Sequence, residues 1–205
     1  MVIFWIAFVI AFIPFTIIFP TIVKGRKNLP KKQGYIVCVN HTTSIDAPLL
    51  DVKLIKRIRF LGKKELCKNK LTTWGHTKVL GTIPVDRGSA DIAAVRNVLG
   101  VLKKGGIVGI FPEGTRNKSA NTDELQELKS GAIMFASKAG VPIVPIIYVK
   151  KPRVFCLNKL IIGEPFYVEG EDPKRLTKEE TESNVVRLAK AMEELRPKKK
   201  NKEQK

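Results

Sequence analysis

The chain contains few of the residues that build disulfide-linked domains or histidine-rich metal centres. Its 205 residues include three cysteines and two histidines. Cys38, Cys67 and Cys156 show neither the spacing of a disulfide framework nor that of metal ligands. Two histidines are also too few for a site built mainly from imidazole ligands. We therefore expect no metal site and a reducing compartment.

Acidic residues are scarce as well. The chain has 37 Lys and Arg against 19 Asp and Glu, which gives a formal net charge of +18. Such an excess implies an anionic partner, which can be a nucleic acid, an acidic protein or an anionic lipid surface. Charge alone does not choose among these partners.

Charged side chains are absent from residues 1–23, and this absence favours a membrane. A straight helix of this length reaches about 35 Å, enough to cross a hydrocarbon core of about 30 Å. Pro14 and Pro20 disfavour a straight span, so two short interfacial helices split near Pro14 are the alternative. Without a basic leader or a small-residue cleavage pattern, we expect the segment to be retained rather than removed as a signal peptide.

A basic cluster follows the apolar segment, with no acidic residue between positions 24 and 32. Its members are Lys24, Arg26, Lys27, Lys31 and Lys32. We expect this cluster to lie on anionic headgroups of the cytoplasmic leaflet, which places the following domain in the cytoplasm. The sequence therefore predicts a membrane anchor over residues 1–23, a cytoplasmic domain over 24–196 and a disordered basic tail over 197–205.

The domain alternates strand-like and helix-like segments. Strands are expected at 35–39, 57–61, 83–85, 107–111, 141–149 and 154–162. Helices are expected at 47–56, 72–79, 89–103 with Ser89 as N-cap, 127–139 and 177–195, with a short basic helical stretch through Lys70. This alternation predicts a single-domain α/β sandwich, with a largely parallel mixed sheet flanked by helices. Functional side chains should collect at the carboxyl ends of the strands.

The most informative motif is the run of residues 40–46, Asn-His-Thr-Thr-Ser-Ile-Asp, directly after the first of these strands. Pro48 suits a first helical turn, so a turn before it can fold Asp46 back towards His41. A carboxylate bonded to one ring nitrogen leaves the other nitrogen able to accept a proton, as a general base does. From this window alone, a helix-capping Asp46 and a structural His41 are an equal alternative.

Three further loops carry cations that suit a phosphate. Residues 111–116 combine Glu113, Gly114 and Arg116, residues 81–87 end in Arg87, and Lys63 follows an expected strand. Arg offers a planar fork that matches phosphate oxygens, and Lys adds a point charge. Any one of these cations can instead be an ordinary solvated surface charge. Their combination with a candidate base is more informative than any single member.

Together these motifs resemble the 1-acyl-sn-glycerol-3-phosphate acyltransferases, also called lysophosphatidic acid acyltransferases. Four blocks match in order, at residues 41–46, 81–87, 111–116 and 141–146, and the likeness covers roughly residues 25–165. Leu61 to Leu66 resembles the family's lysine-containing segment. The second block departs from many relatives by carrying Pro84. The prolines of residues 141–146 suggest a strand start or an edge strand.

The resemblance implies acyl transfer from an acyl thioester to the sn-2 hydroxyl of 1-acyl-glycerol-3-phosphate, giving phosphatidic acid for phospholipid biosynthesis. His41 would be the base and Asp46 its partner, with backbone N–H groups near residues 81–83 as candidate oxyanion donors. The substrate-binding residues that it implies are Lys63, Arg87, Glu113, Gly114, Thr115 and Arg116. It implies neither a metal nor a bound cofactor, since the co-substrate is an acyl-carrier-protein or coenzyme A thioester.

The expected partners are an anionic phospholipid membrane, lysophosphatidic acid and the acyl donor, with residues 24–196 as an acyltransferase domain on the cytoplasmic side of the cell membrane. Lys53, Lys56, Arg57 and the run 63–70 are candidate donor contacts. Three alternatives remain: another lysolipid acceptor, a lipid hydrolase, and a basic nucleic-acid-binding module. A hydrolase of this kind usually needs a nucleophile elbow, which is missing, and Ser44 is a poor substitute. A nucleic-acid module leaves residues 1–23 unexplained and lacks stacking aromatics in its basic runs, so we expect no nucleic acid.

Overall fold

A single mixed sheet organises the protein, and the computed structural model describes residues 2–66, 69–86, 91–117 and 125–197. The strands of this sheet are β1 (Thr21–Lys24), β2 (Tyr35–Val39), β3 (Ile58–Lys63), β4 (Ile83–Val85), β5 (Ile107–Ile110), β6 (Ile143–Tyr148) and β7 (Asn158–Ile162). Their order is β1-β7-β6-β2-β5-β3-β4, and only the β6–β7 pair is antiparallel. The predicted α/β fold with a largely parallel mixed sheet is confirmed.

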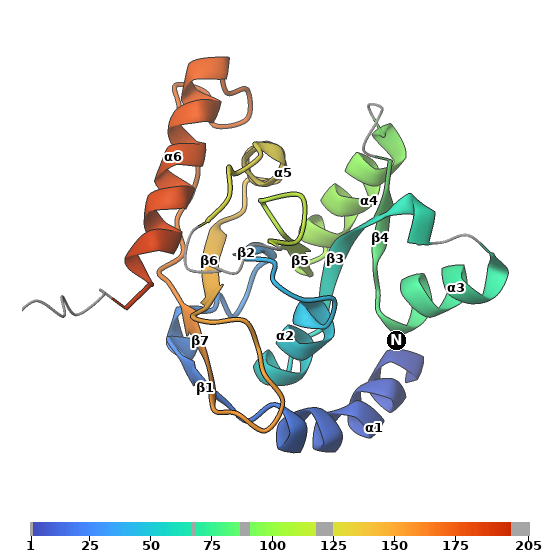
Figure 1. Ribbon diagram of the computed structural model, residues 1–205. Helices are drawn as coiled ribbons and strands as arrows, with labels where there is room; N and C mark the ends of the chain where they lie inside the picture. Colours follow the sequence, from blue (N-terminus) through green and yellow to red (C-terminus); the bar gives the residue numbers. More distant parts are fainter. Residues whose placement is uncertain (1, 67–68, 87–90, 118–124, 198–205) are drawn as a thin grey trace, which may run out of the picture.

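Helices cover both faces of the sheet. They are α1 (Val2–Ile18), α2 (Asp46–Leu54), α3 (Lys70–Trp74), α4 (Ile92–Lys103), α5 (Gly131–Ala139) and α6 (Lys178–Glu194), with short turns η1 (Arg26–Asn28), η2 (Lys64–Leu66) and the π-helical η3 (Gly75–Val79). Figure 1 shows α4, α5 and α6 over one face and α1 and α2 over the other. Each face has its own hydrophobic core. This arrangement is the expected sandwich.

The central strand β2 divides the two cores. All five of its residues are buried, as expected for a strand of a parallel sheet that is covered on both faces. Side chains alternate between the faces of a strand, and here Ile36 and Cys38 belong to the α4–α6 core. Tyr35, Val37 and Val39 belong to the α1–α2 core. The apolar run therefore becomes the interior strand that leads directly to His41.

The amino-terminal segment forms one helix followed by a strand. Helix α1 continues through Pro14, so the predicted split into two short helices is not found. Among the described residues, no helix combines the length and the apolar character needed to cross a membrane. Residues 21–24 form β1, which pairs in parallel with β7, so the sheet includes residues that the sequence assigns to the apolar anchor. Of the predicted tail 197–205, all but Pro197 lies outside the described residues.

Two predicted helix starts are wrong. Helix α5 begins at Gly131 rather than at Glu127, because residues before it run alongside the 111–116 loop, where the Lys129 N–H donates to the Pro112 carbonyl at 2.8 Å. Helix α4 begins at Ile92 with Asp91 as its N-cap, whereas the sequence predicts Ser89, which lies outside the described residues. A carboxylate is as good an N-cap as a hydroxyl, so propensity alone does not separate the two.

The proline-containing strand β6 is not at an edge. It lies between β7 and β2, so the predicted edge position is wrong, although Pro142 does precede the strand. Pro145 is tolerated because the β6–β7 ladder begins only at Ile146. The Pro145 carbonyl still accepts the Gly163 N–H at 2.8 Å. A missing N–H is therefore no obstacle at this position.

A buried carboxyl in α2 makes the stability of the fold depend on pH. Burial raises the pKa of Asp51 to about 8, against the opposing effects of the Ile58 N–H, which donates to its carboxyl at 3.0 Å, and of nearby Arg57. The folded chain therefore holds this proton up to a higher pH than the unfolded chain, whose carboxyl ionises near pH 4. The stability that the proton provides is complete below about pH 4 and is lost as the pH rises to about 8.

Asp51→Asn removes this ionisation and keeps an oxygen that can accept the Ile58 N–H. We expect the variant to lose the Asp51 contribution to the pH dependence of thermal unfolding between pH 4 and 8, and to melt roughly 2–6 °C above the parent protein at pH 9. Calorimetry at pH 5, 7 and 9 measures the effect. Parallel melting curves for the two proteins across this range would contradict it.

Candidate active site

His41 and Asp46 form the centre of the site. His41 lies two residues after Val39, the last residue of β2, and Asp46 is the first residue of α2. The intervening turn folds back as predicted, and the His41 Nδ1 lies 2.9 Å from the Asp46 Oδ2. This contact supports the catalytic interpretation of the motif over a merely capping Asp46.

The Asp46 carboxylate is completely buried and surrounded by donors. Its Oδ2 accepts the backbone N–H groups of Thr42 and Thr43 at 2.6 and 2.7 Å, and its Oδ1 accepts the Thr43 hydroxyl. An ionised carboxylate only accepts hydrogen bonds, so the His41 Nδ1 must donate the proton in its own contact. The hydrogen-bond network thus selects the Nδ1–H tautomer and leaves the lone pair on Nε2.

The imidazole is also fixed by stacking. Its ring lies 3.8 Å from the Phe111 ring with an angle of 16° between the planes, and Phe111 stacks on Phe60 at 5.1 Å. The His41 side chain keeps 19% of its surface exposed, towards a cavity. The stacking and the hydrogen bond to Asp46 therefore restrict rotation of the His41 side chain before any substrate binds, and this preorganisation favours catalysis.

Glu113 has a different place from the one predicted. The sequence assigns it to substrate binding, but the side chain is buried and is not among the described residues that line the cavity. Its two carboxylate oxygens accept the backbone N–H groups of His41 at 3.0 Å and of Gln126 at 3.3 Å. Burial raises the pKa of Glu113, and these N–H groups oppose the rise. Glu113 therefore positions the His41 backbone.

Asn40 is a functional residue that the sequence argument passes over. Its side-chain amide donates to the Tyr148 carbonyl at 3.0 Å and accepts the Tyr148 N–H at 2.8 Å. The pair imitates a strand contact and extends the β2–β6 pairing towards His41. The Tyr148 hydroxyl in turn donates to the Asp46 carbonyl at 3.2 Å. The signal for this role in the sequence is an amide residue between the apolar run 35–39 and the histidine.

A cavity of about 750 Å³ lies beside the histidine at the carboxyl ends of the parallel strands. Its walls include five of the predicted residues: His41, Lys63, Gly114, Thr115 and Arg116. Its apolar lining includes Phe60, Leu61, Leu80 and Phe111. One cavity thus combines a base, two cations and an apolar wall. Arg87, predicted to belong to the same group, lies outside the described residues.

The sequence argument assigns no role to His76, which lines the cavity, whereas Thr82 lies in the segment 81–83 where oxyanion donors are expected. His76 and Thr82 come from the π-helical turn η3 and the segment before β4. The Thr82 N–H donates to the His76 carbonyl at 2.8 Å. This N–H is therefore already used, which removes one of the backbone oxyanion donors expected at residues 81–83. The chain has only two histidines, so the presence of His76 was the one sign in the sequence that it could belong to the site.

Gly114 shapes the loop that carries Thr115 and Arg116. It adopts φ +73°, and a Cβ there would lie 2.8 Å from the Cε of Lys129. Its N–H donates to the Phe111 carbonyl at 3.0 Å and closes a turn. This backbone conformation is unfavourable for a residue that has a Cβ, so glycine is needed for the path from Phe111 to Arg116.

Two of the predicted surface cations have structural partners. Lys53, an expected donor contact, is buried, and its Nζ donates to the Phe15 carbonyl at 3.3 Å. Burial lowers its pKa. The Arg26 guanidinium binds the carbonyls of Lys53 and Leu54 at the end of α2, so it is not simply a headgroup contact. In the described part of the chain, no cluster of three or more His, Cys, Asp or Glu side chains is arranged to hold a metal.

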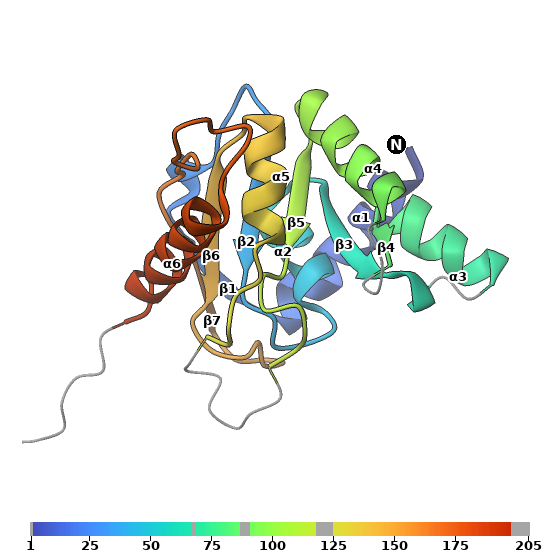
Figure 2. The ribbon, with the colours of Figure 1, turned by 90° about the horizontal axis from the view of Figure 1, so that it is seen from above.

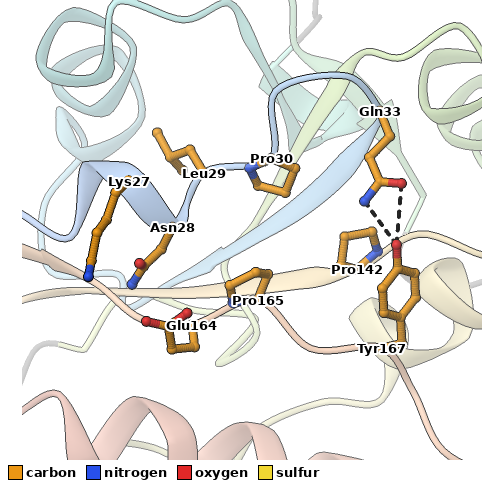
Figure 3. Close-up of a pocket in the computed structure, with 9 residues that line it drawn as sticks. All are labelled: Lys27, Asn28, Leu29, Pro30, Gln33, Pro142, Glu164, Pro165 and Tyr167. Carbon is orange, nitrogen blue, oxygen red and sulfur yellow. Dashed lines mark hydrogen bonds between the residues drawn. The ribbon is translucent and has the colours of Figure 1, made fainter.

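A second cleft, of about 460 Å³, lies at the opposite edge of the sheet, where β2 and β6 begin. Figure 3 shows the Gln33 amide facing the Tyr167 hydroxyl across it, beside Pro142, and the two groups are 2.9 Å apart. This cleft contains none of the predicted site residues. Of these two cavities, the one at the carboxyl ends of the strands therefore contains the predicted site residues.

Comparisons with known proteins agree with this site. A family model described as Acyltransferase matches residues 21–149. The 1-acyl-sn-glycerol-3-phosphate acyltransferase of Bacillus subtilis is 34% identical over 157 residues, which are 71% of this chain and 73% of that protein. The 1-acyl-sn-glycerol-3-phosphate acyltransferase alpha of Homo sapiens is 33% identical over 166 residues, 74% of this chain and 56% of that protein, so the match spans about half of the human relative.

A solved structure extends the likeness to the fold. The 1-acyl-sn-glycerophosphate (LPA) acyltransferase PlsC from Thermotoga maritima has a TM-score of 0.67 and 26% identity, over 94% of this chain and 79% of that chain. The matched residues include both halves of the His41–Asp46 pair and the loop 111–116. The chain therefore belongs to the acyltransferase family, among the 1-acyl-sn-glycerol-3-phosphate acyltransferases.

Proposed function

We propose that the chain transfers an acyl group from an acyl thioester to the sn-2 hydroxyl of 1-acyl-sn-glycerol-3-phosphate, giving phosphatidic acid. The names of the bacterial and human relatives supply the acceptor. The observation that carries the proposal is a carboxylate-bound imidazole in one cavity with two cations, Lys63 and Arg116. A base beside phosphate-binding groups is what acylation of a hydroxyl near a phosphate requires.

His41 acts as the base in the first step. Its Nε2 takes the proton of the sn-2 hydroxyl as the hydroxyl oxygen attacks the thioester carbonyl. Asp46 holds the ring in the required tautomer through the 2.9 Å contact and stabilises the imidazolium that forms. When the carbon–sulfur bond breaks, the imidazolium returns this proton to the departing thiolate. The chain needs no covalent acyl intermediate, because the donor is already an activated ester.

The cations of the cavity bind the acceptor phosphate. Arg116 and Lys63 both line this cavity, and Arg116 lies in the loop after β5 while Lys63 is the last residue of β3. Arg87, as the sequence predicts, would be a third partner. Gly114 and Thr115 shape the loop, with the Thr115 hydroxyl 3.3 Å from the side-chain oxygen of Gln126. Charge-assisted contacts of this kind fix the headgroup, so that its hydroxyl is held near His41.

The donor is a thioester of acyl carrier protein or coenzyme A. Both are polyanionic, and the basic chain attracts either. The exposed cation Lys64 directly follows the cavity residue Lys63 and suits this contact. Neither a metal nor a bound cofactor enters the reaction that we propose.

Helix α1 holds the domain at a membrane as an interfacial helix. It is apolar on all sides: Phe15 and Ile18 pack on the α2 side, while the opposite side is exposed. The exposed residues recur at helical spacing and are Ile6, Val9, Ile10, Ile13 and Ile17. The basic cluster 24–32 follows directly and suits anionic headgroups of the cytoplasmic leaflet. Residues 24–196 then act as the acyltransferase domain at the cytoplasmic side of the cell membrane.

Replacing the base tests the chemistry. His41→Ala leaves the hydroxyl proton without an acceptor, so we expect kcat to fall by about 10²- to 10⁴-fold. The assay follows phosphatidic acid formed from lysophosphatidic acid, with each donor type. Thermal unfolding is the control, and it should stay within a few degrees of the parent protein, because the ring is partly exposed. Turnover at the parent rate would remove His41 from the mechanism.

Replacing a cation tests acceptor recognition. Arg116→Ala should raise KM for lysophosphatidic acid by about 5- to 50-fold with little change in KM for the donor, because one charge-assisted phosphate contact is lost. The matched control is Arg96→Ala, which removes an exposed cation from α4 and should change neither constant. Monoacylglycerol, which lacks the phosphate, is the comparison acceptor. Equal effects of Arg116→Ala on both acceptors would contradict phosphate binding at this residue.

A further inference from the structure

The loop between β6 and β7, residues 149–157, exposes an unusual group of apolar side chains. Phe155 is 75% exposed, Leu157 is 70% exposed and Val154 is 54% exposed. Single exposed apolar residues are common on soluble proteins, but several within one short loop indicate a contact surface. The loop has no part in the reaction described above.

The loop is held firmly by one buried side chain. The Asn158 amide donates to the carbonyls of Arg153 and Cys156 at 3.1 and 2.9 Å, and its oxygen accepts the Arg153 N–H at 2.9 Å. Between these bonds, Phe155 adopts φ +53°, which a residue with a side chain seldom does. The fixed backbone therefore presents the apolar side chains outwards, rather than leaving them to collapse onto the core.

The loop is joined to the end of α1. The Phe155 N–H donates to the Ile18 carbonyl at 2.7 Å, and the Asn158 N–H donates to the Pro20 carbonyl at 2.8 Å. Figure 1 shows the loop, in orange, reaching the level of α1 at the bottom of the view. In Figure 2 it lies among the loops at the carboxyl ends of β2 and β5, the edge that carries His41. The loop thus connects the α1 surface with the active-site edge.

The charges of the loop match an anionic surface. Lys150, Lys151 and Arg153 are exposed, and residues 149–163 contain no acidic side chain. Basic groups beside exposed apolar groups are the combination that binds anionic lipid interfaces, where the cations meet the headgroups and the apolar groups enter the acyl boundary.

We propose that residues 149–157 form a second lipid-contacting element, in which Val154, Phe155 and Leu157 enter an anionic bilayer beside α1. The inference rests on the proposed interfacial position of α1. A membrane contact through α1 alone allows the domain to rotate about the helix axis. A second contact through residues 149–157 fixes this rotation. The cavity with His41 is then held towards the bilayer, where a lysophospholipid acceptor resides.

The experiment places an environment-sensitive fluorophore on Cys156, the exposed cysteine within the loop. Cys38 is fully buried, and Cys67→Ser removes the third cysteine. A second labelled protein carries Ile13→Cys on α1, with Cys156→Ser and Cys67→Ser. Each is mixed with phosphatidylglycerol vesicles and with phosphatidylcholine vesicles. We expect both labels to brighten and shift to the blue, more strongly with phosphatidylglycerol, and to be quenched by lipids that carry a quencher near the headgroup.

The outcomes separate this inference from the proposed function. A responding α1 label with a silent Cys156 label overturns the loop contact and leaves the membrane role of α1 intact. Silence of both labels overturns the α1 association and the loop contact together, while the assays with His41→Ala still test the chemistry. A response of both labels supports the proposal.

A matched pair of double variants measures the size of the effect. Phe155→Ser with Leu157→Ser should lower partition of the unlabelled protein onto phosphatidylglycerol vesicles by about tenfold or more. Ile92→Ser with Val186→Ser removes two apolar side chains of similar exposure from α4 and α6, on the other face of the sheet, and should leave partition unchanged. Unchanged partition of the loop variant, with a raised KM for the acyl-carrier-protein donor, would mean that the loop binds the donor protein instead.

Discussion

The hydrogen bonds that converge on the Asp46 carboxylate are the interaction on which the site depends. Two backbone N–H groups, a hydroxyl and the His41 ring all donate to this one buried group. The same residue begins α2, so the start of the helix and the tautomer of the base are determined together. Removing the carboxylate would leave several buried donors without an acceptor, which costs more free energy than the loss of an exposed ion pair. The same contacts of Asp46 therefore determine both the geometry of the base and the local fold.

The rest of the site supports this centre from distant parts of the sequence. Glu113 holds the His41 N–H from a position 72 residues later, and Asn40 binds Tyr148 across 108 residues. Both contacts lie at the carboxyl ends of neighbouring strands β5, β2 and β6. An open parallel sheet brings such ends together whatever their separation along the chain. The cations of the cavity reach the base for the same reason.

The parts of the structure that the sequence predicts are those governed by local chemistry. The turn between His41 and Asp46 is determined within six residues. Buried strands such as residues 35–39 can be recognised from their apolar composition. The roles of Glu113 and Lys53 were not predictable, because a charged residue looks alike in the sequence whether it faces solvent or a backbone N–H. Strand β1 was hidden because it continues an apolar run, and the interior position of β6 depends on the strand order, which the sequence does not state.

In the proposed reaction, Asp46 keeps the proton on Nδ1 of His41, so that Nε2 is the base. Nitrogen NMR of protein with labelled histidine reads the tautomer directly, and the signals of the two histidines are assigned with a His76→Asn variant. We expect the neutral form of His41 to carry its proton on Nδ1 and to leave Nε2 without one, and we expect this preference to be weaker in Asp46→Asn. A neutral His41 that carries its proton on Nε2 in the parent protein would contradict it.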